Sequence, residues 1–96
     1  MGREIKELQA ELRRFAEERD WGQFHSPKNL AASLSIEAAE VLEHFQWLTE
    51  EQSRQLDEAR RKAVAHEIAD VFLYLLQLSD KLGIAAARRA REACAQ

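Results

Sequence analysis

Four acidic residues of this sequence form two pairs with the same spacing. Glu37 and Glu40 form the first pair, and Glu67 and Asp70 form the second. Residues three apart in a helix lie on one face, so each pair directs its carboxyl groups the same way. The second pair lies in an apolar stretch, where an ionised carboxylate is costly unless it is paired, hydrogen-bonded or bound to a metal. Ligand sets made only of oxygen favour hard cations, so the acids predict a Mg²⁺ site, with Mn²⁺ as the alternative. Zinc is a less favoured ion for such a ligand set.

Both pairs also have a purely structural interpretation. Glutamates at this spacing are common on solvated helices, and Arg60 or Arg61 could neutralise some of the acids. That interpretation weakens for the second pair, because its neighbours are apolar, and weakens further because two such pairs lie on adjoining predicted helices. A di-iron bundle is the weaker metal alternative, because its ligands include a histidine three residues after a glutamate and no histidine here has that spacing.

Apolar residues recur at steps of three and four along the chain, which predicts an all-α fold. The pattern divides into four helical pieces, at residues 3–19, 26–48, 49–82 and 85–95. No stretch shows the alternation that is typical of a strand. From Val64 onward the third piece is apolar almost all round, so we expect this helix to be buried on all sides.

Capping residues predict where these pieces begin and end. Ser26 followed by Pro27 is a strong start signal, because serine caps the helix and proline suits its first position. Thr49 and Gln52 have the spacing of a capping box. Gly83 is well placed to end the third piece in a left-handed conformation.

Length and composition restrict the class of protein. The 96 residues are expected to form a single domain, 1–96, whose core is modest, and self-association is a common way to cover apolar helix faces in so small a chain. The net charge is −3 with both signs interspersed, so we expect no nucleic acid partner. The longest apolar run, Val71 to Leu76, is too short to span a bilayer, so we expect no membrane association. Cys94 is the single cysteine, and with no signal peptide evident the expected compartment is the cytoplasm.

Motifs around the acids resemble those of a known superfamily. The pattern E-x-x-E, 26 intervening residues and E-x-x-D is similar to the signature of the MazG-like, all-α NTP pyrophosphohydrolases. The longer run from Phe15 to Leu30, together with Phe45-Gln46-Trp47 and the segment from Asp70 to Leu75, closely resembles the dCTP pyrophosphatase branch. The similarity covers residues 8–84, which is most of the chain.

This resemblance implies a fold, a reaction and an assembly. Members are four-helix MazG-like bundles completed by dimerisation or tetramerisation, with helices of neighbouring subunits completing each site. They hydrolyse a (deoxy)nucleoside triphosphate to the monophosphate and pyrophosphate, using Mg²⁺ held by the four acidic positions. The implied substrate here is dCTP or a modified dCTP, and the implied role is cleaning of the nucleotide pool. Of the four acids, Glu37 or Glu40 is favoured to orient or deprotonate the attacking water.

A nucleotide substrate would need groups that bind the base and the phosphates. Aromatic side chains are expected to stack on the base, with base choice made by hydrogen bonds to its edge and Lys28 reaching phosphate. These aromatic residues could equally be core residues, and Lys28 could equally be a solvated lysine. The predicted substrate-binding residues are Trp21, Phe24, His25, Lys28, Asn29, Trp47 and Tyr74.

The sequence departs from the family pattern in two places. Ile36 occupies a position where many members have another glutamate. The C-terminal segment lacks the usual asparagine and Tyr-Pro, and we expect Arg88, Arg89 and Arg91 to replace them in part at the phosphates. The departure leaves two rival hypotheses, which are a noncatalytic dimeric helical module that binds nucleotide or protein, and a purely structural bundle.

Overall fold

The computed structural model describes residues 2–19 and 25–95, and these form helices joined by turns, without strands. The helices, in chain order, are α1 (Gly2–Glu18), α2 (Pro27–Glu43), α3 (Glu50–Ser53), α4 (Glu58–Leu82) and α5 (Ala86–Cys94). The predicted all-α class is therefore confirmed. Within the same residues, no helix is both long and apolar enough to cross a membrane.

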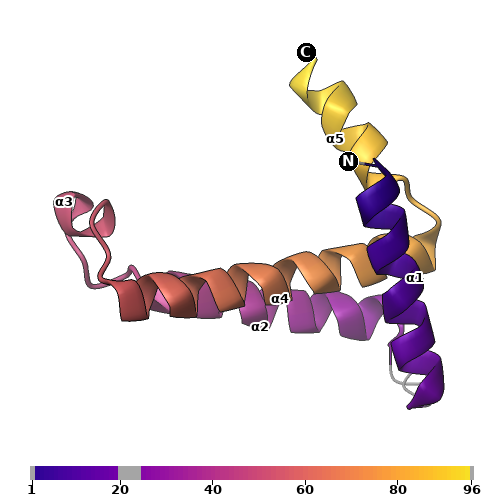
Figure 1. The fold of residues 1–96 in the computed structure, drawn as a ribbon, viewed down its shortest axis with the longest axis horizontal. Coiled ribbons are helices and arrows are strands. Elements are labelled where there is room, and N and C mark those ends of the chain that lie inside the picture. Colours follow the sequence, from indigo (N-terminus) through magenta and orange to yellow (C-terminus); the bar gives the residue numbers. More distant parts are fainter. Residues whose placement is uncertain (1, 20–24, 96) are drawn as a thin grey trace.

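Helices α2 and α4 form the central unit, lying side by side and antiparallel (Figure 1). Helix α1 crosses this pair toward the C-terminal end of α4, and α5 projects away from it (Figure 1). Two polar contacts fasten α1 to α4. The Gln9 amide donates to the Leu76 carbonyl oxygen at 3.4 Å, and Arg13 pairs with Asp80 at 2.9 Å.

The predicted helix starts at Ser26 and Thr49 are both present. The Ser26 hydroxyl accepts from the backbone N–H of Asn29 at 3.1 Å, and Thr49 and Gln52 form the reciprocal bonds of a capping box. The third predicted piece, 49–82, divides into two helices at its polar start, because α3 ends at Ser53 and α4 begins only after Asp57. The Asp57 carboxylate caps α4 by accepting from the backbone N–H of Arg60 at 2.7 Å.

Little of the apolar surface is covered within one chain. Among the described residues the buried hydrophobic side chains are Leu30, Val64 and Leu76. The expectation that α4 is buried on all sides was therefore wrong for the single chain. Its uncovered apolar residues share one stripe at steps of three, four and seven, comprising Ile68, Phe72, Leu75 and Leu82, and this set is called the α4 stripe below.

The dimensions of the chain agree with this low burial. Its radius of gyration is 15.6 Å, whereas a compact domain of this length has about 12.5 Å. The accessible surface is 7558 Å², whereas a folded monomer of this mass exposes roughly 5,700 Å². The four long helices of the expected bundle are present, but they do not enclose a common core within the described part of one chain.

Gly83 provides a test of how α4 ends. Its φ is 64°, and a Cβ built at this position meets nothing within 4 Å. The cost of a side chain is therefore conformational, because a left-handed backbone is unfavourable for residues with a Cβ. Gly83→Ala should lower the free energy of unfolding by about 1 kcal/mol, measured by urea denaturation at a fixed protein concentration. Gly83→Asn should lose less stability, since asparagine tolerates this conformation. Equal stability of all three proteins would contradict the explanation.

Candidate metal centre and the cavity beside it

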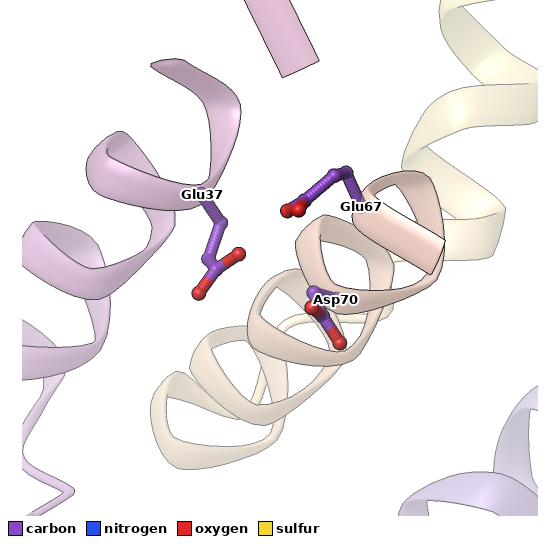
Figure 2. Close-up of side chains that lie close together, drawn as sticks. All are labelled: Glu37, Glu67 and Asp70. Carbon is purple, nitrogen blue, oxygen red and sulfur yellow. The ribbon is translucent and has the colours of Figure 1, made fainter. Parts of the chain in front are cut away.

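Three carboxylates meet where α2 packs against α4. Glu37 reaches from α2 toward Glu67 and Asp70 on α4 (Figure 2). One oxygen from each residue lies within 4.8 Å of one oxygen from each of the others. All three side chains are half-buried. The spacing of three in α4 puts two acids on the face that contacts α2, and the antiparallel pairing brings Glu37 opposite them.

Glu40 stands at the edge of this cluster. It lies one turn after Glu37 on α2, is half-buried, and is close enough to raise the pKa of both Glu37 and Glu67. The convergence of the predicted acids is therefore seen in the structure. Three of them share a tight arrangement, while Glu40 contacts that arrangement from one side.

The crowding of carboxylates raises the pKa of two of them. Burial of the side chain, followed by the hydrogen bond and charge of Glu40, raises the pKa of Glu37 from 4.5 to about 7. The charges of Asp70 and Glu67 act in the same direction. The pKa of Glu67 is raised chiefly by its hydrogen bond with Glu40 and then by burial, and a hydrogen bond with Glu37 opposes this rise. The folded chain thus holds negative charges together against their mutual repulsion.

No arginine or lysine relieves that repulsion in the part of the chain that the structure describes. Arg61 pairs with Glu58 at 3.9 Å and not with the cluster. The nearest basic group is His66, whose ring lies 3.6 Å from the Asp70 carboxylate and is largely exposed. One oxygen of Glu37 and one of Glu67 are buried with no hydrogen-bond partner. Orphaned carboxylate oxygens converging at this separation fit a hard divalent cation, which bonds to several oxygens at once.

A cavity of about 410 Å³ adjoins the cluster on the side of α1. Asp70 and Tyr74 line it from α4, Phe15 lines it from α1, and His25 lies at its edge, half-buried. The remaining lining residues are Leu8, Glu11, Leu12, Leu73 and Gln77. The cavity combines apolar walls and aromatic rings with a few polar groups, which is typical of sites that bind small organic molecules.

Other predicted substrate-binding residues lie apart from this cavity. Trp47 follows the end of α2, and 86% of its surface is exposed. Lys28 and Asn29 are exposed in the first turn of α2, where Asn29 takes part in the cap. Trp21 and Phe24 lie outside the described residues.

The expected phosphate-binding arginines are also not at the cluster. Arg88 and Arg89 lie 3.6 and 3.5 Å from Glu92 on the same helix. Helix α5 projects away from the α2–α4 pair (Figure 1), and its residues are not among those that line the cavity beside Asp70. Within one chain, replacement of the missing family residues by these arginines is therefore not seen.

Gln77 also lines the cavity, although it is not among the predicted site residues. It lies three residues after Tyr74 and seven after Asp70, so all three share one face of α4. The available signal was a polar residue within an apolar run, at helical spacing from an acid already singled out.

Comparisons with known proteins place this chain in a family. The model of the family described as the MazG-like family matches residues 32–95. Proteins named dCTP pyrophosphatase 1 are 41% identical in Homo sapiens and 42% identical in Mus musculus, each over 78 residues. These matches cover 79% of this chain but 44% of each relative, so the chain spans less than half the length of these curated proteins. A crystal structure of a pyrophosphatase from Archaeoglobus fulgidus matches with a TM-score of 0.88 and 41% identity, covering 95% of this chain and 85% of that one.

The raised pKa of Glu37 predicts how the stability of the metal-free protein depends on pH. The folded chain retains a proton that the unfolded chain releases between pH 4.5 and about 7. The stability contributed by this group is complete below that range and is lost as the pH rises through it. The glutamine of Glu37→Gln does not titrate, so this variant does not lose that stability. Its free energy of unfolding, relative to that of the unmodified protein, should therefore rise between pH 5 and 8, measured by urea denaturation with EDTA present. Glu43→Gln, which changes an exposed acid of the same helix, is the control. Parallel stability profiles for Glu37→Gln and the unmodified chain would contradict the electrostatic description.

Proposed function

This chain belongs to the MazG-like family, and from that premise we propose that it is a pyrophosphohydrolase of nucleoside triphosphates. The proposed reaction converts a deoxynucleoside triphosphate, preferably dCTP or a modified dCTP, into the monophosphate and pyrophosphate. The observation that carries the proposal is the convergence of Glu37, Glu67 and Asp70 with oxygens left unpaired. The names of the matched relatives support dCTP as the first substrate to test.

We propose Mg²⁺ as the cofactor, with Mn²⁺ as a substitute. Glu37, Glu67 and Asp70 would hold it, since their oxygens already lie within 4.8 Å of one another. When bound, the ion neutralises phosphate charge and lowers the pKa of a coordinated water. The chain contributes the fixed positions of its carboxylates, so the acids need not be gathered after the substrate arrives.

Glu40 is the residue that we propose to orient or deprotonate the attacking water. It lies close enough to Glu37 and Glu67 to raise the pKa of both, yet it is not among the three residues whose oxygens lie within 4.8 Å of one another. Because Glu40 is not one of the proposed metal ligands, its carboxylate can accept a proton from the water while the three ligands remain bound to the ion. Glu37, the other favoured residue, belongs to the tight group and is assigned to the metal.

The cavity beside Asp70 is the proposed place for the sugar and base. It begins at the cluster and extends between α1 and α4, so a triphosphate at the acids would direct its nucleoside into this space. Tyr74 and Phe15 offer rings for contact with the base, and His25 offers a polar group. Trp47, Lys28 and Asn29 would act at this site only from a second subunit or after a rearrangement.

Self-association is part of the proposal. The α4 stripe is uncovered, and the accessible surface exceeds that of a compact monomer by about 1,900 Å². One partner of a standard stable interface buries about 800 Å², so this excess is more than one such interface requires.

Two substitutions separate metal binding from water activation. Glu67→Gln should lose the stabilisation by Mn²⁺, which for the unmodified protein is about 2.7 kcal/mol at a concentration 100 times the Kd. It should also lose at least about 100-fold in dCTP hydrolysis. Glu40→Gln should retain most of the thermal shift with Mn²⁺ and lose kcat by about 100-fold or more. The measurements are melting temperature with and without Mn²⁺, and phosphate release with coupled inorganic pyrophosphatase over the four dNTPs. Glu43→Gln is again the control.

Three outcomes would count against this account. Normal turnover by Glu67→Gln would remove that residue from the metal site. Binding of dNTPs and Mn²⁺ without any turnover would favour the noncatalytic nucleotide-binding module. The absence of both metal binding and turnover would favour a structural bundle.

The α4 stripe allows a separate test of assembly. Leu75 is 44% exposed at its centre, and a charge at this position would be buried without a partner if the stripe packs against a second subunit. Leu75→Glu should therefore shift the protein to a smaller species in analytical ultracentrifugation. Ala59→Glu adds the same charge in the exposed first turn of α4 and should leave the assembly unchanged. An unmodified chain that sediments as a monomer would refute self-association directly.

A further inference from the structure

We propose that His66, assisted by Lys62, binds the two terminal phosphates of the nucleotide and holds the pyrophosphate as it leaves. The inference rests on the proposed function, because it assumes that the nucleoside occupies the cavity beside Asp70. It assigns phosphate-binding residues to a chain in which the expected arginines of α5 lie away from the acids (Figure 1).

Both residues belong to one row of side chains along α4. The row has steps of four residues, a spacing that forms a ridge on the surface of a helix. In chain order it comprises Lys62, His66, Asp70 and Tyr74. Tyr74 lines the cavity proposed for the nucleoside, and Asp70 lines that cavity while belonging to the acidic cluster. The row therefore leads from the nucleoside space, past the acids, to two basic residues.

The order of this row matches the order of the groups in a nucleoside triphosphate. Tyr74 and His66 each lie four residues from Asp70, which is about 6 Å along the helix axis in opposite directions. A nucleotide with its nucleoside beside Tyr74 and its α-phosphate at the acids directs its β- and γ-phosphates away from the cavity. Along α4, the direction away from the cavity leads to His66.

The His66 ring is accessible to a ligand that binds at the acids. Its side chain is 77% exposed, and Nε2 lies 3.6 Å from Oδ2 of Asp70, which is too long for a hydrogen bond. The contact with Asp70 therefore leaves the ring N–H available. Imidazole carries an N–H in its neutral form as well as in its charged form, so donation to a phosphate oxygen does not depend on protonation.

Lys62 extends the basic end of the row. It is exposed and lies one turn before His66 on α4. Its ammonium group stands on a flexible stem and can reach a phosphate beside the neighbouring turn. Arg61, the next basic residue, lies 3.9 Å from Glu58 instead. Lys62 and His66 thus offer positive charge and a donor to phosphates that the clustered carboxylates repel.

Donors in this position would act on the leaving group. Hydrolysis joins the water oxygen to the α-phosphorus, passes one water proton to Glu40, and breaks the bond from the α-phosphorus to the oxygen that bridges to the β-phosphorus. The electron pair of the broken bond stays with the pyrophosphate, so negative charge develops there. Hydrogen-bond donors that are already in place where charge develops stabilise the transition state. His66 should therefore affect kcat as well as binding.

The test compares His66→Ala and His66→Gln with the unmodified chain. Calorimetry with Mn²⁺ measures the binding of α,β-imido-dCTP, which resists hydrolysis, and of dCMP, which lacks the two terminal phosphates. His66→Ala should weaken binding of the analogue by about 10-fold or more, as expected for the loss of a hydrogen bond to a charged group. It should also lower kcat for dCTP, while its binding of dCMP stays unchanged. His66→Gln keeps an N–H donor and should restore most of the loss.

Two further measurements separate phosphate binding from other effects. Lys62→Ala should weaken binding of the analogue by about threefold, the effect of one exposed charge. Arg60→Ala removes the same charge at a position about 200° around the helix from Lys62 and should have no effect. The melting temperature with Mn²⁺ alone tests whether His66 acts only by orienting Asp70, because a residue that contacts phosphate leaves the shift by Mn²⁺ intact.

The outcomes distinguish this inference from the proposed function. Unchanged binding of the analogue by His66→Ala overturns the inference while leaving pyrophosphohydrolysis intact. Equal weakening of the analogue and dCMP, or a lost Mn²⁺ shift, assigns His66 to the support of the acids and also overturns it. If the unmodified chain binds both ligands without hydrolysing dCTP, the proposed reaction fails, and the ratio of the two affinities still decides the role of His66. Failure to bind either ligand overturns both.

Discussion

Glu37, Glu67 and Asp70 repel one another across the contact between α2 and α4. The unpaired oxygens and the raised pKa of Glu37 both follow from this crowding of carboxylates. The packing of the two helices holds the carboxylates close together and partly out of water, and it leaves some of their oxygens without partners. In the described residues the chain provides no arginine or lysine to offset the charge. It instead retains protons on Glu37 toward neutral pH. Such an arrangement opposes stability in the absence of a cation, which is why we propose one at this site.

The same helices leave an apolar surface uncovered. Leu30, Val64 and Leu76 are few for a core of this chain length, while the α4 stripe and Trp47 face outward. A short chain with long helices cannot surround its own central pair, because α1 crosses the pair at one end and α5 projects from it (Figure 1). The proposed self-association would account both for this exposed surface and for the distance of Trp47 from the cavity.

Local signals in the sequence predicted local structure well. The caps at Ser26 and Thr49, the end at Gly83 and the shared face of Glu67 and Asp70 follow from spacing and residue type alone. The residue at which α4 begins was not predicted, because the Asp57 cap lies in a polar stretch that lacks apolar residues at helical spacing. The expected burial of α4 on all sides is not seen in the single chain, because periodicity indicates which faces need covering and not which chain covers them. Gln77 escaped notice because its significance depends on α1, whose crossing position no local pattern specifies.

Helix α1 forms one wall of the cavity and is held to α4 by few contacts, among them Gln9 with Leu76 and Arg13 with Asp80. A molecule lodged between the two helices would touch both walls and add its own contacts to that weak attachment. Occupancy and docking of α1 would then be thermodynamically linked, each favouring the other. A nucleotide that fits the cavity would thus stabilise the docking of α1 on α4. Binding of the base and completion of the tertiary structure would then occur together.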